Sequence, residues 1–195
     1  MNIKKPTLSQ IFTVLLVLFV IVYLRSARLK SYVIMGFMML GFFKPGVPEL
    51  KPGEKLEQAP AMIVQNNNGK VIDLQQQKGK VVFINFWATW CPPCLAELPS
   101  INDFYLKVKD NPNIVFLSVD VDNDLPKSSL FLQKREYQFP VYGGRLDALP
   151  KQFYSGNIPT TLVIDKKGDV VFNHIDKANY DDEQFAQYVI GLSKQ

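Results

Sequence analysis

Residues 80–99 form the part of the sequence that most constrains the fold. The apolar run KVVFINF (Lys80–Phe86) is followed, after four further residues, by Cys91-Pro92-Pro93-Cys94. An apolar run of this kind is typical of a central strand that is buried on both faces. Beyond Cys91 the apolar residues recur at helical spacing, at Leu98, Ile101, Tyr105 and Val108. The block predicts a buried strand leading into a helix that begins at the two cysteines.

The rest of the C-terminal part predicts alternating strands and helices. Residues 61–74 should form a hairpin that turns at Asn68-Gly69. A second buried strand is expected at Asn113–Asp120, a helix at Leu125–Gln138, two strands around the Lys167-Gly168 turn within Ile158–Ile175, and a closing helix containing Phe185, Tyr188, Val189 and Leu192. Asp181 and Gln184 have the spacing of a capping box for that helix. The pattern indicates an α/β fold with a mixed central sheet flanked by helices.

An uncharged run, Pro6–Leu24, precedes this domain. As a helix, its 19 residues would reach roughly 28 Å, close to the thickness of about 30 Å of a bilayer's hydrocarbon core. The following RSARLKS has no small-x-small cleavage site, because Arg25 stands where a small residue should precede Ala27. We therefore expect residues 1–30 to be an uncleaved transmembrane anchor in the lipid bilayer.

A second uncharged run occupies residues 31–43 and is short for a membrane span. It suits an interfacial helix, or a tilted or re-entrant piece. Residues 44–57 are rich in proline and predict a stiff linker before a domain at 58–195. Both a single span with the N-terminus inside and a hairpin with RSARLK inside keep positive charge in the cytoplasm and place residues 45–195 outside it.

The composition excludes some functions and leaves three roles for the cysteines. The chain is 47% hydrophobic with a net charge of +4, and it has no run of five or more Lys or Arg residues, so nucleic-acid binding is not expected. A bridge between Cys91 and Cys94 would stabilise the fold little, because its loop is tiny. A metal site usually needs three or four ligands, and the one histidine, His174, is far along the chain. These observations favour a reactive thiol pair over a structural bridge or a metal site.

The position of the pair suits redox chemistry. At the start of a helix, unpaired N–H groups and the helix dipole favour a thiolate at Cys91. Cys94, one turn later, can attack a mixed disulfide and release the partner. Pro92 at the first helical position costs nothing, and Pro93 removes another donor, so the Cys94 N–H is the expected donor to the Cys91 sulfur. Pro99 should kink the helix.

Residues 79–99, GKVVFINFWATWCPPCLAELP, resemble the active-site signature of membrane-anchored, thioredoxin-like proteins of the TlpA/ResA type, with CcmG-like proteins nearby. The similarity covers residues 58–195, including GNIPTTLVIDKKGDVV (Gly156–Val171), and is loose between Asp120 and Ser155, where an extra helix and strand usually occur. It implies a thioredoxin-like fold and a thiol–disulfide oxidoreductase that needs no cofactor or metal. It also implies a bacterial protein of the cytoplasmic membrane, single-pass, with its catalytic domain in the periplasm or extracytoplasmic space.

The resemblance also implies roles for single residues. Cys91 matches the attacking cysteine, Cys94 the resolving one, and the two form the redox-active disulfide. Ile158-Pro159 matches the loop whose cis proline faces the disulfide, and Glu97 matches the acidic residue near the active site. Asn85 replaces the buried carboxylate of thioredoxins, so Glu97 is the expected proton relay for Cys94. The residues expected to contact clients are Trp90, Pro92, Pro93, Ile158 and Thr160.

Several functions compete at this stage. The first is a reductase that takes electrons from a membrane donor and passes them to disulfides of client proteins, apocytochrome c being the family's best-known client class. Others are a disulfide oxidase or isomerase, a thiol peroxidase, a copper or zinc carrier, and an interaction module with an idle disulfide. Ala88 and Ile84 stand where a peroxidase would have a threonine or serine and a proline. The spacing of the cysteines is one residue shorter than in copper carriers of this fold.

Overall fold

The computed structural model describes residues 7–40, 42–48, 56–144, 146–147, 149, 151 and 153–195. Residues 1–6 of the predicted anchor and residues 49–55 of the predicted linker lie outside the described residues. The elements are α1 (Leu8–Arg25), α2 (Ala27–Met39), β1 (Ile63–Asn66), β2 (Val71–Asp73), the 3-10 helix η1 (Leu74–Gln77), β3 (Val81–Trp87), α3 (Pro92–Val108), β4 (Ile114–Asp120), α4 (Leu125–Gln133), β5 (Val141–Gly144), β6 (Thr160–Ile164), β7 (Val170–Ile175) and α5 (Glu183–Lys194).

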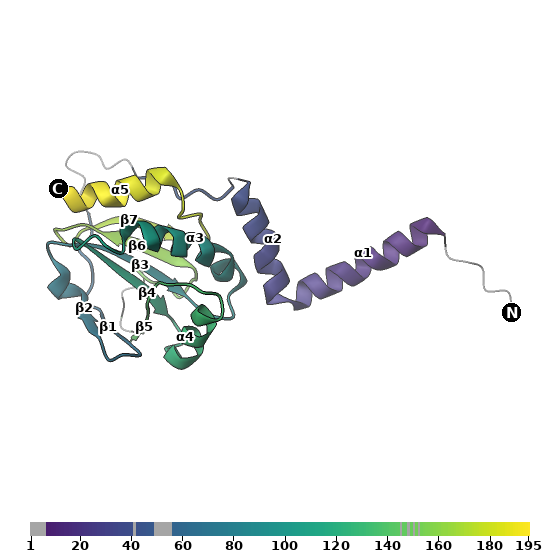
Figure 1. The fold of residues 1–195 in the computed structure, drawn as a ribbon, viewed down its shortest axis with the longest axis horizontal. Helices are drawn as coiled ribbons and strands as arrows, with labels where there is room; N and C mark the ends of the chain where they lie inside the picture. The colour runs from purple at the N-terminus through teal and green to yellow at the C-terminus, as the bar shows by residue number, and fades with distance from the viewer. Residues whose placement is uncertain are drawn as a thin grey trace.

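The strands form one mixed sheet in the order β2-β1-β5-β4-β3-β6-β7 (Figure 1). β3 is parallel to β4, β4 is parallel to β5, and the other neighbours are antiparallel. Every residue of β3 is buried, which confirms the central strand expected from its apolar run. The predicted hairpin is also confirmed, because β1 and β2 pair and Gly69 takes a φ of +76° in the turn between them.

The two faces of the sheet carry separate apolar cores. Alternate residues of β3 point to opposite faces, so Phe83 lies in one core and Ile84 in the other. The first core contains apolar side chains of α3, α4 and α5. The second core includes Leu146, Leu149 and Phe153, from the segment between β5 and β6. This arrangement places the N-terminal end of α3 at the carboxyl end of β3.

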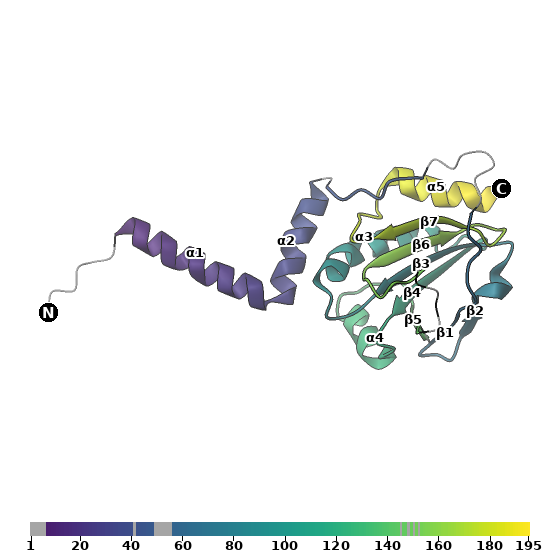
Figure 2. The same cartoon turned by 180° about the vertical axis from the view of Figure 1, so that it is seen from behind.

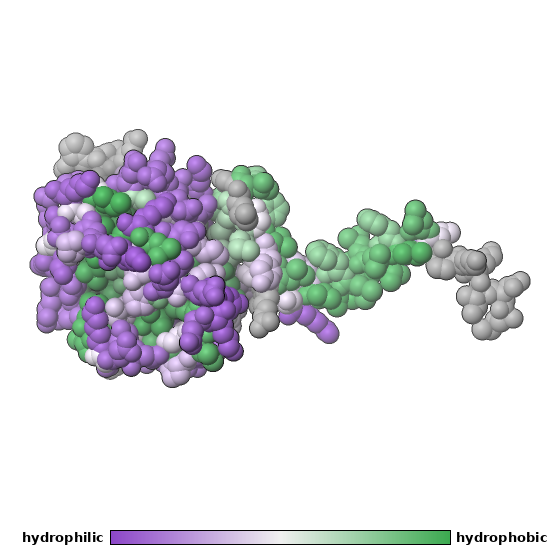
Figure 3. All heavy atoms as spheres, in the orientation of Figure 1, coloured by the Kyte–Doolittle hydropathy of each residue, from purple (hydrophilic) through white to green (hydrophobic). Residues whose placement is uncertain are grey.

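The two N-terminal helices differ in their surroundings. α1 is long and apolar enough to cross a membrane, and none of its apolar window is buried. Figures 1 and 2 show it extending away from the domain, and Figure 3 shows its apolar surface beside the polar surface of the domain. Ser26 ends α1 by donating its N–H to Val22 O and begins α2 by accepting the Leu29 N–H. α2 packs against α3 and buries Met38.

Two details of the sequence prediction are wrong. The helix expected to run to Gln138 ends at Gln133, because Glu136 takes a left-handed φ of +59° and the Tyr137 N–H returns to Leu132 O. The closing helix has its N-cap at Asp182, whose carboxylate accepts the N–H groups of Gln184 and Phe185.

Asp181, the expected cap, instead pairs with Lys107 at 2.8 Å, so the helix begins one residue later than its sequence spacing indicates. The loosely matched stretch between Asp120 and Ser155 contains α4 and β5, as the resemblance implied.

Candidate active site

The two cysteines lie where β3 passes into α3. Cys91 is the N-cap of α3, with extended backbone angles (φ −88°, ψ 105°), and Pro92 and Pro93 occupy the first helical positions. The Cys94 N–H donates to Cys91 Sγ at 3.2 Å, which confirms the donor expected from the two prolines. The start of the helix therefore directs an N–H group and the positive end of its dipole at the Cys91 sulfur.

Cys91 and Cys94 are joined by a disulfide with a Cα–Cα distance of 5.3 Å. The sequence predicts an exposed nucleophile, but Cys91 is only 3% exposed and Cys94 is fully buried. The exposure prediction is wrong for this oxidised form, because the sulfur packs into the apolar core that α3 shares with β3. Only a small part of the Cys91 surface is therefore accessible to a partner in this form.

The loop before β6 faces the disulfide. The Ile158–Pro159 peptide bond is cis, as the resemblance implied. Ile158 O lies 3.8 Å from Cys91 Sγ, and Ile158 is half-buried whereas Pro159 is buried. Thr160 is also buried, and its hydroxyl donates to Asn157 O at 2.8 Å. The Thr160 side chain thus holds the loop together and does not present a surface to a client.

Trp90 is the large exposed apolar side chain next to the disulfide. It is 56% exposed, and its indole Nε1 donates to Asp122 Oδ2 at 2.8 Å. Asp122 lies in the turn after β4, and its own N–H is bound by the Asp120 carboxylate. Pro92 and Pro93, which follow Trp90 and Cys91 in the chain, are half-buried. The site therefore has an apolar rim, and the Asp122 carboxylate, which no sequence pattern indicated, orients the Trp90 ring.

Glu97 lies inside the protein, behind the disulfide. Its side chain is fully buried, and one oxygen, Oε1, accepts a hydrogen bond of 2.8 Å from Asn85 Nδ2. The other, Oε2, accepts the Ala178 N–H at 3.1 Å. Asn85 Nδ2 also donates to Thr161 Oγ1 at 2.9 Å, which connects the acid to β6. Glu97 therefore has two neutral donors and no ion-pair partner within hydrogen-bond distance among the described residues.

This environment changes the acidity of Glu97. Burial removes water from the carboxylate and raises its pKa from 4.5 to about 8, although the hydrogen bonds from Asn85 and Ala178 act in the opposite direction. The pKa of the buried Tyr180 is raised well above its usual value, by burial and by the charge of Glu97. A carboxyl group with a pKa near neutrality can both donate and accept a proton under physiological conditions.

Most of the residues predicted from the sequence lie together at the site, and the structure shows further residues there that were not predicted. The Cys91–Cys94 disulfide has four of these residues around it, namely Trp90, Pro92, Pro93 and Ile158. Behind it, Asn85 and Glu97 are joined by a hydrogen bond. His174 lies on β7 opposite Thr161. Within the described ranges, no group of three or more His, Cys, Asp or Glu residues is arranged to hold a metal ion. Ala178 was missed, because a backbone N–H leaves no signal in the sequence.

Comparisons with known proteins agree with this geometry. The Redoxin family model matches residues 51–190. The thiol-disulfide oxidoreductase ResA of Bacillus thuringiensis subsp. konkukian is 36% identical over 121 residues, which cover 60% of this chain and 69% of that protein. ResA of Bacillus cereus strain ZK is 36% identical over 115 residues, covering 59% of this chain and 66% of that protein, just under two thirds of its length.

Solved structures agree with the fold. A thiol:disulfide interchange protein of the thioredoxin family from Chlorobium tepidum superposes with a TM-score of 0.59 at 25% identity, covering 72% of this chain and 98% of that one. StoA from Bacillus subtilis, at 24% identity and a TM-score of 0.55, covers 68% of this chain and 98% of its own and shares the fold. The chain belongs to the Redoxin family, and within it to the ResA/TlpA-like, thioredoxin-like thiol–disulfide oxidoreductases.

Proposed function

We propose that this protein is a membrane-anchored, extracytoplasmic dithiol reductase of protein disulfides. The observation that supports it best is the Cys91 sulfur at the start of α3, which accepts the Cys94 N–H and lies beside the cis-Pro159 loop. A thiolate at this position is stabilised by the helix start and has its resolving partner one turn away. Trp90 and the two half-buried prolines offer apolar contacts to a client chain.

The proposed reaction moves two electrons from the cysteine pair to a client. The Cys91 thiolate attacks one sulfur of a client disulfide, an S–S bond forms between Cys91 and the client, and the second client sulfur leaves as a thiolate. Cys94 then loses its proton and attacks Cys91 Sγ. The Cys91–Cys94 bond forms, and the first client sulfur leaves as a thiolate. The client is reduced and the protein is oxidised to the disulfide form.

Glu97 is the proposed proton relay for Cys94. With a pKa of about 8, roughly nine tenths of the Glu97 side chains are protonated at pH 7 in the disulfide form. When a dithiol donor reduces the bridge by attacking Cys91, the Cys94 thiolate leaves and can take the Glu97 proton. In the reductase direction the Glu97 carboxylate takes that proton back. Asn85 supports the acid through its hydrogen bond and cannot itself exchange a proton.

The proposed location rests on α1. Its 18 residues have a mean hydropathy of 2.2, and none of this helix is buried. We propose that α1 spans a bacterial cytoplasmic membrane once, within an anchor at residues 1–30, and that the domain at 58–195 lies outside the cytoplasm. α2, which begins two residues after α1 ends, would then lie next to the bilayer, where a membrane protein could supply the electrons.

The proposed clients are proteins with accessible disulfides, and apocytochrome c is the class that the family resemblance suggests. Its Cys-x-x-Cys-His motif must be reduced before haem is attached. A disulfide oxidase is the alternative direction for the same chemistry. The two directions differ in reduction potential, since strong oxidants lie near −120 mV and reductants of the thioredoxin type near about −270 mV.

The test combines trapping with a potential measurement on the full chain in detergent micelles. Cys94→Ser should accumulate a mixed disulfide between Cys91 and a peptide that carries a Cys-x-x-Cys disulfide, because the resolving step is blocked. Cys91→Ser should trap nothing. We expect a reduction potential closer to the thioredoxin value than to about −120 mV. Trapping through Cys94 instead, or a potential near the oxidant value, would contradict the proposal.

A further inference from the structure

The segment that follows α2 contacts the loop between β7 and α5. We call residues 42–48 the tether and residues 176–182 the acid loop. Phe43 O accepts the Asn179 N–H at 2.8 Å. The Lys177 ammonium lies 4.4 Å from the centroid of the Phe43 ring, and Lys44 Nζ lies 3.3 Å from Asp182 Oδ2. The tether thus binds the acid loop through a backbone hydrogen bond, a cation–π contact and an ion pair.

The acid loop is also the part of the chain that binds Glu97. The Ala178 N–H donates to Glu97 Oε2, and Ala178 lies between the two residues whose backbone or side chain contacts Phe43. Two residues further, the Tyr180 N–H donates to Ser100 Oγ at 3.1 Å, and the Ser100 hydroxyl donates to Glu97 O at 2.8 Å. The acid loop therefore binds Oε2 of the buried acid, whereas Asn85 binds Oε1.

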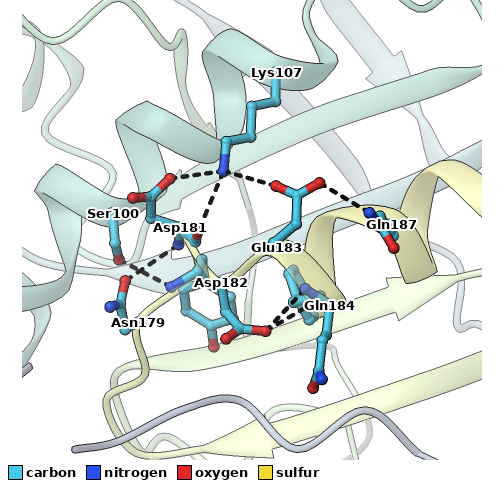
Figure 4. A network of polar contacts seen from close by, with 10 residues as sticks. Ser100, Lys107, Asn179, Asp181, Asp182, Glu183, Gln184 and Gln187 are labelled. Atoms are coloured by element: carbon cyan, nitrogen blue, oxygen red, sulfur yellow. Dashed lines mark hydrogen bonds and ion pairs between the residues drawn. The ribbon is translucent and has the colours of Figure 1, made fainter. Parts of the chain in front are cut away.

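Other contacts hold both halves of the acid loop. Figure 4 shows Lys107 of α3 bound to Asp181, with Nζ 2.8 Å from the Asp181 carboxylate and 3.1 Å from its carbonyl oxygen. The same figure shows the Ser100 hydroxyl near the start of α5. In the first half of the loop, the Asp176 N–H donates to Pro159 O at 3.0 Å, and Phe43 contacts Lys177 and Asn179 on either side of Ala178. The tether therefore adds to the contacts that α3 and the Pro159 loop make with the acid loop.

The backbone has a positive φ on both sides of this contact, and this conformation is unfavourable for Phe43. Phe43 has a φ of +66° and Asp176 a φ of +101°, in the left-handed region that L-residues other than Asn and Asp rarely adopt. Such angles persist where surrounding contacts determine them. Phe43 is the bulky residue of the two, so its contacts with Lys177 and Asn179 must offset a conformational cost. The contact is therefore specific to this arrangement of tether and loop.

We propose that the tether is a positioning element for the redox site: Phe43 and Lys44 hold the acid loop closed over Glu97 and so keep water from the acid. This inference rests on the proposed role of Glu97 as the proton relay. α1 and α2 lead into the tether, the tether contacts the acid loop, and the acid loop binds Glu97, so this series of contacts connects the N-terminal helices to the buried acid. Phe43 and Lys44 touch neither sulfur, and their effect on the chemistry passes through Ala178.

The groups that face Glu97 determine the sign of the effect. Asn85 and Thr161 come from the sheet, Asp176, Lys177 and Tyr180 from the acid loop or its ends, and Cys94 lies one turn away on α3. Burial is the largest influence on the Glu97 pKa, and it outweighs the hydrogen bonds that lower this pKa. Opening the loop would admit water, and the pKa of Glu97 would therefore fall towards its ordinary value.

The experiment uses the full chain in detergent micelles, with the disulfide intact. The test variant is Phe43→Ala/Lys44→Gln, and the matched control is Phe42→Ala, because the Phe42 ring contacts Phe37 of α2. Hydrogen exchange of the Ala178 amide reports closure of the loop. The Glu97 carboxyl is titrated by NMR with ¹³C-labelled glutamate, its signal being assigned by its loss in Glu97→Gln. Near-ultraviolet circular dichroism verifies that both variants are folded.

We expect the test variant to exchange the Ala178 amide about tenfold faster and to lower the Glu97 pKa by about one unit, and the control to change neither. Unchanged exchange and titration in the folded test variant would overturn the inference, as would equal changes in the control. Neither readout depends on client reduction. If the wild type fails to reduce clients but these shifts occur, the proposed function is wrong while the contact between tether and acid loop stands.

Discussion

Asn85 Nδ2 donates a hydrogen bond of 2.8 Å to Glu97 Oε1, although both side chains are fully buried and neither has an ionic partner at hydrogen-bond distance within the described chain. The pair joins the central strand β3 to the helix that carries the disulfide. The amide takes a place where thioredoxins have a carboxylate, according to the family resemblance. We propose that Glu97, three residues beyond Cys94 on α3, exchanges the proton that such a carboxylate would exchange.

The first prediction concerns this hydrogen bond. Replacing Asn85 by Leu removes a donor that favours the charged form of Glu97, so the pKa of Glu97 should rise above about 8 by about one unit. Carbon-detected NMR titration of the glutamates would measure the change. Ser118→Ala is the matched control, because Ser118 pairs with Asn85 in the sheet and is buried, but its hydroxyl has no partner among the described groups. A fall in the Glu97 pKa would refute the prediction.

The second prediction concerns stability and pH. The folded pKa of Glu97 is raised above the unfolded value of 4.5, so the native state binds the extra proton between pH 4.5 and about 8. The contribution of Glu97 to the free energy of unfolding should be largest below pH 4.5. It should decrease by roughly 4–5 kcal/mol in total as the pH rises from 4.5 through about 8. Glu97→Gln, a neutral isostere, should flatten this dependence. Urea unfolding under non-reducing conditions at several pH values would measure it.

The third prediction concerns proton transfer. Glu97→Gln cannot accept the Cys94 proton, so the mixed disulfide between Cys91 and a client should resolve more slowly, by a factor of about 10²–10⁴ if the relay acts as a general base. Quenched-flow analysis of the mixed disulfide would measure this step separately from the first attack. The first attack, which involves Cys91, should keep its rate. Resolution at the wild-type rate would remove Glu97 from the mechanism.

The fourth prediction concerns the exposed indole beside the disulfide. Asp122→Ala removes the acceptor of the Trp90 Nε1–H, so the ring should lose its fixed orientation. We expect kcat/KM for a disulfide-containing peptide to fall about three- to tenfold, which corresponds to one exposed hydrogen bond. The reduction potential should not change, because Asp122 contacts neither sulfur. Asp110→Ala, at another exposed aspartate, is the control and should have no effect.

The fifth prediction concerns the second proline between the cysteines. Pro93→Ala restores a backbone N–H in the first turn of α3, where it can stabilise a thiolate at Cys91. A stabilised thiolate makes the reduced form more stable, so the pair should become more oxidising, by about 30 mV for a tenfold change in equilibrium constant. Redox titration against glutathione would measure the shift. Pro99→Ala, in the same helix but away from the sulfur, should leave the potential unchanged.

Much of the site could be predicted from the sequence because its parts are local. The apolar run of β3 and the periodicity of α3 placed Cys91 at a helix start, and the two prolines indicated which N–H remains for its sulfur. The cis bond at Ile158–Pro159 came from the family resemblance, since spacing alone carries no such information. Local patterns and one long motif were sufficient for these features.

Long-range contacts could not be predicted in the same way. Ala178 binds Glu97 across 81 residues of sequence through a backbone N–H, which any residue but proline provides. Asp181 forms an ion pair with Lys107, and the residue that caps the N-terminus of α5 is therefore Asp182. At the end of α4, Glu136 occupies a left-handed position that usually indicates glycine, and the sequence therefore contains no stop signal there.

The packing of α2 against α3 affects how partners meet the disulfide. α2 begins two residues after α1 ends, and it contacts α3, the helix that begins at the redox pair. A pocket of about 180 Å³ lies at this junction, and its lining includes Ser31, Tyr32 and Met35 of α2 and Leu95 and Pro99 of α3. With α1 in a bilayer, the sulfurs would be kept at a restricted height above the lipid surface. Partners in the same membrane would then search for them in two dimensions and at high effective concentration, whereas soluble proteins would gain no such advantage.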